Sequence, residues 1–93
     1  MNNFELDLDK TITKLAGNQL GRYIFQEQLK EEIDYKKEIT ITFPDRIDTI
    51  ASSFIQGFFE EIVQNIGISG VESMVIINSS IPNIKKLILE NLL

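Results

Sequence analysis

Residues 38–63, EITITFPDRIDTIASSFIQGFFEEIV, decide the fold because they contain a strand, a turn and a helix in succession. The segment EITITF is short and rich in β-branched residues, which favours a central β-strand. Pro44 has no amide proton to donate, so the strand must stop there, and Pro44-Asp45-Arg46 is typical of a turn. Apolar side chains then recur every four residues, at Phe54/Ile55, Phe58/Phe59, Ile62/Val63 and Ile66. This stripe predicts an amphipathic helix that ends at Gly67.

The segments on either side continue the alternation of strands and helices. Before residue 38, alternating apolar side chains predict a strand over 4–8, and a second short strand is expected over 11–13. A helix is expected from Gly17-Asn18 to about Asp34. After residue 67, Gly70 is expected to open an apolar strand at 73–77 that is buried on both faces. Pro82 suits the first turn of a last helix. The predicted order is β(β)-α-β-α-β-α.

This order favours an α/β fold in a single domain, residues 1–93. We expect three to four strands in a mixed, partly parallel sheet with about three helices, joined by right-handed crossovers. The stripe of the second helix needs a sheet to cover it, so Phe54, Phe58, Ile62 and Ile66 are expected to face inward. By the same argument, Phe58-Phe59 is expected to be core, and the alternative is an exposed binding surface.

Composition excludes most kinds of chemistry. The chain has no Cys and no His, so it lacks thiolate metal ligands, thiol nucleophiles and the usual general base. Its glycines form neither a dinucleotide fingerprint nor a phosphate-binding loop. The net charge of −5 opposes binding to nucleic acid. We therefore expect a protein that is not an enzyme, has no cofactor and does not bind nucleic acid.

The sequence also predicts the cellular compartment and the absence of a metal site. It lacks an apolar run of membrane-spanning length and a signal peptide, so we expect a cytoplasmic protein without membrane contact. Carboxylates at Glu5, Asp7 and Asp9, and at Asp45 and Asp48, supply oxygens of the kind that hard cations bind, but their spacing matches no calcium loop. We expect a solvated edge and turn instead of a metal site.

Two adjacent serines, Ser52 and Ser53, precede the apolar stripe of the second helix. Ser53 followed by Gln56 fits a capping box, in which the two side chains bind free amide groups at the helix start. The same position suits phosphorylation, since a phosphate there would face free amides and the positive end of the helix dipole. Sequence geometry leaves both interpretations open.

The block ITITFPDRIDTIASSFIQGFFEEI, residues 39–62, resembles the centre of STAS-like domains, especially the STAS-like family of unknown function. The resemblance extends loosely from Phe4 to the final helix. STAS domains include anti-sigma-factor antagonists, in which a partner kinase phosphorylates a serine in this loop. The resemblance implies an α/β fold, a protein-binding role and a kinase-like ATPase as a partner, with Ser53 or Ser52 as candidate phosphoacceptor. Ala51 and Phe54 stand where the antagonists carry aspartate and glycine.

These patterns lead to two functional hypotheses. The first is a regulatory module that docks a protein partner through the turn and helix start at residues 45–56, with serine phosphorylation as a gate. Its candidate binding residues are Asp45, Arg46, Asp48, Thr49, Gln56 and Arg22. The second is a small acidic inhibitor or adaptor, encoded by a mobile element or phage, that blocks a basic surface of a larger target.

Two further expectations concern the arginines and self-association. Arg22 and Arg46, the only arginines, suit binding of a carboxylate or phosphate, and the alternative for each is a surface ion pair. An open strand edge and the apolar pair Leu92-Leu93 make a homodimer plausible.

Overall fold

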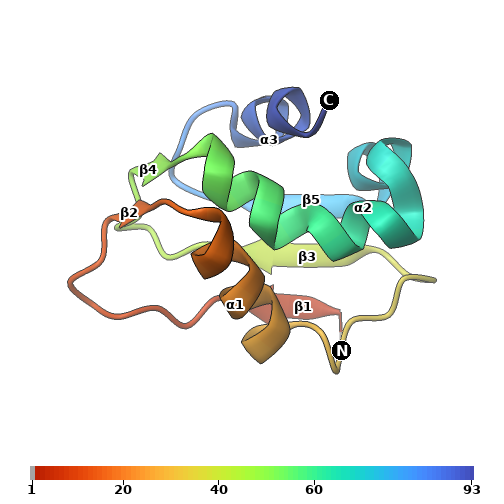
Figure 1. Ribbon diagram of the computed structural model, residues 1–93, viewed down its shortest axis with the longest axis horizontal. Helices are drawn as coiled ribbons and strands as arrows, with labels where there is room; N and C mark the ends of the chain where they lie inside the picture. Colours follow the sequence, from red (N-terminus) through yellow and green to blue (C-terminus); the bar gives the residue numbers. More distant parts are fainter. Residues whose placement is uncertain (1) are drawn as a thin grey trace.

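The computed structural model describes residues 2–93 and arranges them in two layers, a parallel β-sheet and the helices packed on it (Figure 1). The main sheet consists of β1 (Asn3–Glu5), β3 (Ile39–Thr42) and β5 (Val75–Asn78), and a second sheet of β2 (Lys14–Leu15) and β4 (Thr49–Ile50). The helices are α1 (Asn18–Gln28), α2 (Ser52–Met74) and α3 (Ile84–Leu92). The predicted α/β class is confirmed.

The strand that was expected to be central, β3, lies between β1 and β5. Both of its neighbours are parallel to it, with Asn3 opposite Thr40 and Ile39 opposite Val75. The strands β2 and β4 are also parallel, so every strand pair within residues 2–93 is parallel, where the sequence predicted a mixed sheet. The short strand β4 was not predicted.

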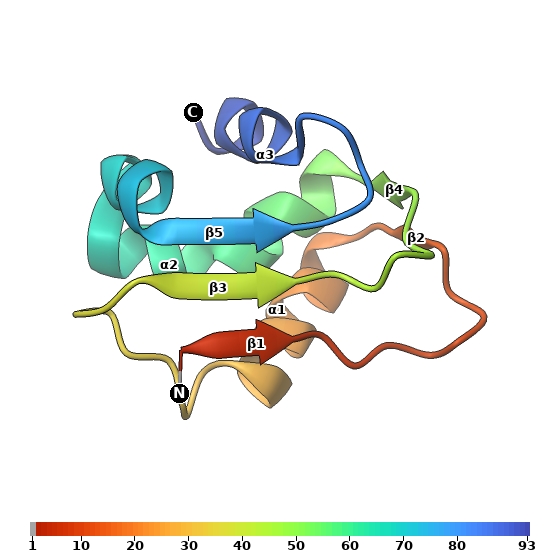
Figure 2. The same cartoon turned by 180° about the vertical axis from the view of Figure 1, so that it is seen from behind.

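The connections of the main sheet place both long helices on the same face. The chain moves from β1 through α1 to β3, and from β3 through α2 to β5, each time one strand further in the same direction (Figure 1). Both crossovers are right-handed, which is the expected hand, so the second helix lies beside the first. Figure 2 shows the consequence: the opposite face of the sheet carries no helix.

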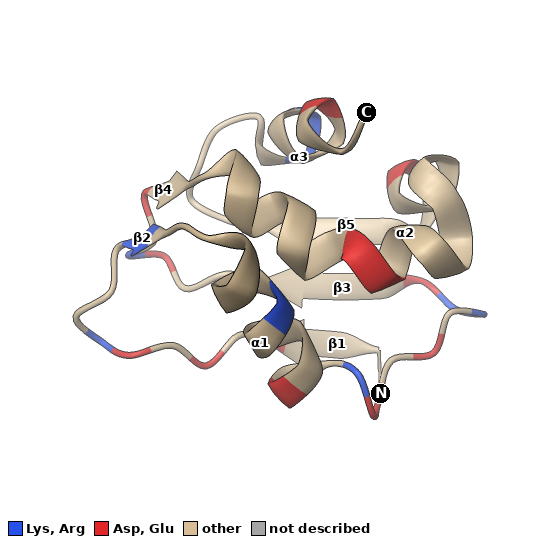
Figure 3. Ribbon diagram, viewed as in Figure 1, with Lys and Arg blue, Asp and Glu red and all other residues tan. Residues whose placement is uncertain are grey.

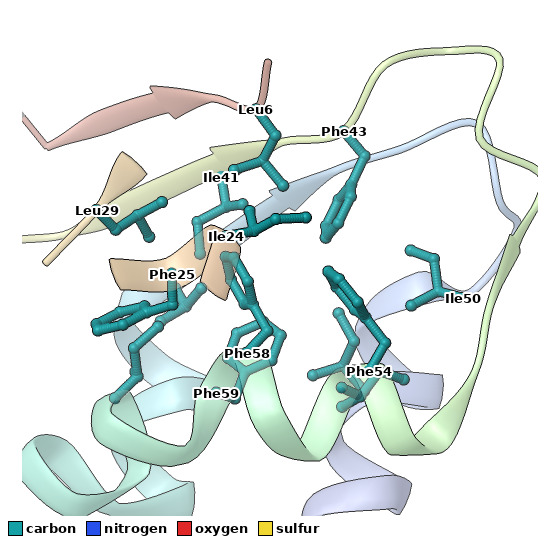
Figure 4. Close-up of a cluster of buried hydrophobic side chains, with 14 of the residues drawn as sticks. Leu6, Ile24, Phe25, Leu29, Ile41, Phe43, Ile50, Phe54, Phe58 and Phe59 are labelled. Carbon is teal, nitrogen blue, oxygen red and sulfur yellow. The ribbon is translucent and has the colours of Figure 1, made fainter. Parts of the chain in front are cut away.

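Aromatic side chains form the centre of the core between the sheet and the two helices (Figure 4). Phe58 is fully buried and lies between four other phenylalanine rings. Its ring centroid is 5.0 Å from that of Phe59, 5.7 Å from Phe54, 6.0 Å from Phe25 and 6.3 Å from Phe43. Phe54, Phe58 and Ile62 face inward as predicted, and Ile66 is partly buried against the same cluster.

Two glycines allow α1 and α2 to touch backbone to backbone. A Cβ atom at Gly21 would lie less than 3.0 Å from backbone atoms of Phe54 and Phe58, and one at Gly57 would collide with the backbone of Asn18. Backbone atoms cannot move aside as a flexible side chain can. The absence of a side chain at both positions therefore sets the distance between the helices.

The first helix is shorter than predicted, ending at Gln28 instead of Asp34. The side chain of Gln28 accepts a hydrogen bond from the amide of Asp7 and donates one to its carbonyl, each at 2.8 Å. The chain then turns back toward the sheet, and the side chain of Asn2 binds the backbone of the returning segment at Asp34, Lys37 and Glu38. These tertiary contacts replace the helical turns that the sequence predicted.

The first two strands also differ from their predicted positions. The strand β1 ends at Glu5, although Leu6 is buried and Leu8 is partly buried. The second strand lies at Lys14–Leu15 instead of residues 11–13. The carboxylate of Asp9 accepts hydrogen bonds from both the amide and the hydroxyl of Thr11, which makes a turn at the predicted strand.

The glycines near the end of α2 act differently from the prediction. Gly67 does interrupt the helix, with φ 71° and ψ 173°, but a second helical segment follows and continues to Met74. Gly70, expected to open the strand, lies buried in that segment, where a Cβ atom would collide with the side chain of Ile66. The strand β5 starts only at Val75.

The strand β5 and the start of the last helix need two further corrections. Ile76 is 41% exposed, so β5 is not buried on both faces. Its outward side chain lies on the face that no helix covers. Pro82 lies in the turn before α3 instead of in its first turn, and Asn83 has the left-handed conformation with φ 57° at the helix start.

None of the helices formed by residues 2–93 is both long and apolar enough to cross a membrane.

We predict that Gly57→Ala lowers the free energy of unfolding by about 2 to 3 kcal/mol, since overpacking a close contact typically costs about 1 to 3 kcal/mol. Urea denaturation followed by circular dichroism measures this loss. The matched control is Gln26→Ala, an exposed position on α1, where a change within about 0.5 kcal/mol is expected. Equal stability of the two variants would contradict the close backbone contact.

Candidate docking surface

The start of α2 does not have the predicted capping box. The helix begins at Ser52, the residue at its N-cap is Ala51, and no side chain makes a capping hydrogen bond. Ser53 is thus already inside the first turn, and its hydroxyl oxygen instead accepts a hydrogen bond from the backbone amide of Gly17 at 3.0 Å. Ser53 is half-buried, whereas Ser52 is exposed.

The small sheet β2–β4 explains why Ser53 reaches Gly17. The amide of Asp48 donates to the carbonyl of Thr13, and the amide of Ala51 donates to the carbonyl of Leu15, each at 2.8 Å. These bonds hold the residues before α1 beside the residues before α2. The hydroxyl of Ser53 adds a third link between the starts of the two helices.

An exposed row of side chains runs along α2 from its start. Ser52, Gln56 and Glu60 are spaced by four residues, so they lie on one face of the helix. Ser52 and Gln56 are exposed, and Thr49 is exposed just before the helix. The row leads into a groove of about 360 Å³ between α2 and α3, which is lined by Gln56, Glu60, Val63, Gln64, Asn91, Leu92 and Leu93.

Gln56 joins the predicted docking segment to this groove. Its side-chain nitrogen donates a long hydrogen bond of 3.4 Å to the carbonyl of Asn91 on α3. The groove residues on α3 and the residues Val63 and Gln64 were not among the candidates. Val63 and Gln64 follow Gln56 by seven and eight residues, so helical spacing could have identified them, but no sequence signal places α3 beside α2.

Arg22 makes a surface ion pair, the alternative that the sequence left open for it. Its guanidinium lies 3.0 Å from the carboxylate of Glu60, linking α1 to the exposed row on α2. Lys30 and Glu61 form a similar pair at 3.1 Å. Exposed pairs of this kind contribute about 0 to 1 kcal/mol each. Arg22 therefore lies beside the exposed row on α2 and is paired with one of its members, Glu60.

The side chain of Arg46 makes hydrogen bonds to the backbone of the same chain. Its guanidinium donates hydrogen bonds to the carbonyl oxygens of Leu8, at 2.6 Å, and Asp9, at 2.8 Å. These bonds hold the loop after β1 against the turn after β3. Asp45 lies on a different part of the surface from Gln56, in a hollow of about 290 Å³ that also includes Glu5 and Thr42. The structure thus does not bring all the candidate residues together.

Asp48 and Asp9 are exposed carboxylates whose pKa values are lowered. A hydrogen bond from Lys14 at 3.0 Å, and then one from Thr49, hold the pKa of Asp48 below the ordinary value of 3.8. Bonds from the backbone amide and the hydroxyl of Thr11 lower the pKa of Asp9 in the same way. Hydrogen bonds to the charged form are the main cause in both cases.

Charged residues are spread over the helices and loops, while β3 and β5 carry none (Figure 3). Within residues 2–93 there is no group of three or more His, Cys, Asp or Glu residues that could hold a metal ion.

Comparison with protein-family models, with curated proteins and with solved structures gave no match.

We predict that Ser53→Ala lowers the free energy of unfolding by about 1 kcal/mol or more, because the half-buried amide of Gly17 loses its acceptor. The neighbouring change Ser52→Ala should stay within about 0.5 kcal/mol. Chemical denaturation of both variants measures the difference. Faster hydrogen exchange at the Gly17 amide in Ser53→Ala would identify the broken bond, and equal stability of the two variants would contradict it.

A second prediction concerns the pKa of Asp48. Because this pKa is lowered in the folded state, the Lys14 contact stabilises the fold above about pH 4, and this contribution is lost as the pH falls through the lowered value. Lys14→Met should move the pKa of Asp48 up toward 3.8. NMR titration of the side-chain carboxyl carbons measures this shift. Asp9 is the internal control, since Thr11 binds it, and its pKa should not move.

Proposed function

We propose that this chain is a STAS-like regulatory module of the cytoplasm, without enzymatic activity, which docks a protein partner through the start of α2. The observation that carries the proposal is the row Ser52, Gln56 and Glu60 on α2, with the exposed Thr49 just before it, which continues into the groove between α2 and α3. The resemblance of residues 39–62 to STAS-like domains supports the same surface. A kinase-like ATPase is the proposed class of partner.

The proposed gate is Ser52 in preference to Ser53. The hydroxyl of Ser52 is exposed on the first residue of α2, where an enzyme can reach it. A phosphate there would lie near the free amides of the first helical turn and the positive end of the helix dipole. The hydroxyl of Ser53 is half-buried and already accepts the Gly17 amide, so phosphorylating it requires that this bond break.

A second candidate function is an acidic adaptor that covers a basic surface of its target. Glu27, Glu31 and Glu32 are all exposed at the end of α1 and the turn that follows, and none of them forms an ion pair with another residue of 2–93. Binding through these residues would weaken steeply with salt, because exposed charges are screened. Binding through Ser52 and Gln56 would depend little on salt.

The test starts with capture of a partner from lysate by the full chain, followed by calorimetric titration of the purified partner. We predict that Ser52→Glu changes the dissociation constant at least tenfold, equivalent to about 1.4 kcal/mol. Ser69→Glu, the same substitution at an exposed site beyond the kink in α2, should leave it unchanged.

Three outcomes of this experiment separate the candidates. Equal affinities for the wild-type chain, Ser52→Glu and Ser69→Glu would overturn the docking surface. The acidic adaptor would be favoured if the affinity of the wild-type chain falls steeply with salt and the affinity of the double variant Glu31→Gln, Glu32→Gln does not. Mass spectrometry after incubation with the partner and ATP tests the gate: phosphate on Ser52 supports it, and phosphate on Ser53 alone contradicts the assignment.

A further inference from the structure

A single glycine separates the two helical segments of α2, residues 52–66 and 68–74. Gly67 has φ 71° and ψ 173°, a conformation that is essentially restricted to glycine. The nearest heavy atom to a Cβ at this position would be the Oγ of Ser69, at 4.0 Å, so the constraint lies in the backbone and not in the packing. Figure 1 shows that the second segment turns away from the axis of the first and leads back to β5. The kink therefore depends on the residue type at one position.

A second glycine allows the two segments to fold against each other. Gly70 is buried, and a Cβ atom there would lie 2.6 Å from the Cβ of Ile66. In an uninterrupted helix, Cβ atoms four residues apart are about 5 to 6 Å from each other, so these two positions would not collide. Glycine is also a poor residue for the interior of a helix. Gly67 and Gly70 thus both favour the kinked form, one through its backbone and the other through its size.

The kink allows β5 to reach the main sheet. The strand starts at Val75, directly after the last helical residue, Met74, so no loop is available to reverse the chain. In a straight α2, residues 68–74 would extend about 10 Å beyond the position of the kink, at about 1.5 Å for each residue. The strand β5 would then be carried away from β3 of the same chain.

The part of the chain after α2 forms a separable unit. The strand β5 lies at an edge of the main sheet, where it pairs with β3. Lys85 on α3 donates a hydrogen bond to the carbonyl of Val75, so the strand and the last helix are joined to each other. Val75, Ile84 and Ile88 of this unit are buried against the rest of the chain. If the unit leaves its place, it must bury these side chains elsewhere.

We propose that Gly67 is a hinge at which the chain opens, and that β5 and α3 then complete the sheet of a second copy. An opened chain leaves one side of β3 unpaired and exposes the side chains that β5 and α3 covered. The same unit of a second copy fits this gap with the same contacts, so a reciprocal exchange restores both cores. Val71, which is fully buried in the kinked form, favours the closed monomer. The extent of exchange therefore depends on the hinge and on the chain concentration.

The oligomeric state of the full chain tests the hinge. We expect the wild-type chain, refolded at micromolar concentration, to sediment mainly as a monomer of 10.7 kDa. Gly67→Ala should shift the equilibrium toward a dimer by about tenfold or more, because alanine disfavours the kink and favours a continuous helix. Gly70→Ala should shift it in the same direction, because its Cβ collides with Ile66 in the kinked form.

Gly17→Ala is the matched control for these variants. Gly17 has φ 103°, and a Cβ atom there would meet no heavy atom within 4 Å, so the substitution strains the backbone as it does at Gly67. Gly17 precedes α1, however, and does not connect α2 to β5. We expect Gly17→Ala to lower the midpoint of thermal unfolding and to remain a monomer.

Disulfide formation between two different chains tests the exchange itself. Thr42 lies opposite Asn78 in the sheet, and the amide of Asn78 donates to the hydroxyl of Thr42 at 3.2 Å. The chain has no cysteine, so Thr42→Cys and Asn78→Cys give two chains with one thiol each. When both are unfolded together, refolded at high concentration and oxidised, exchange brings the two thiols together. Thr42→Cys mixed with Tyr23→Cys is the control pair and should stay unlinked.

The outcomes are distinct. A disulfide between the two chains in the Gly67→Ala background, with a weaker one in the wild-type background, supports the proposal. A folded Gly67→Ala that remains a monomer would overturn it. So would a dimer without this disulfide, which is expected if copies associate through the edge of β1 or through Leu92 and Leu93. If Gly67→Ala does not fold, absence of the disulfide in both Gly70→Ala and the wild-type background overturns the proposal.

Discussion

The backbone contact between α1 and α2 is the constraint on which the rest of the structure depends. Because Gly21 and Gly57 have no side chains, the two helices approach closely enough for one aromatic cluster, centred on Phe58, to fill the space between them and the sheet. The same approach brings the two helix starts together, so that Ser53 can bind Gly17. Ser52 and Gln56 on α2 are exposed because the opposite side of that helix packs into the core.

The order of the main elements could be predicted because it depends on local patterns. Four-residue spacing identified the core side of α2, and the β-branched run before Pro44 identified the central strand. Element ends were less predictable, because distant residues determine them. The side chains of Gln28 and Asn2 bind backbone groups more than 20 residues away, and no local pattern contains that information. The exposure of Ile76 follows from the direction of the crossovers.

The role of the candidate site stays a prediction, and the placement of some of its residues could be predicted. Ser52 and Gln56 are both exposed, and their spacing of four residues is enough to place them on one face of α2. The hydrogen bond between Ser53 and Gly17 could not be predicted, because Gly17 lies 36 residues earlier in the chain. The same limit applies to Arg46, which binds two carbonyl groups after β1 where the sequence suggested an anion or an ion pair.

Parallel pairing of β1, β3 and β5 also has a consequence for how the chain folds. Asn3 pairs with Thr40 and Ile39 with Val75, so each pairing must close a loop of about 36 residues before its hydrogen bonds can form. Such non-local contacts slow folding, because the entropy of loop closure is lost first. During synthesis, β1 has no partner strand until β3 has left the ribosome, and β3 in turn waits for β5. The strand β1 is therefore synthesised before its partner and stays unpaired until β3 is available.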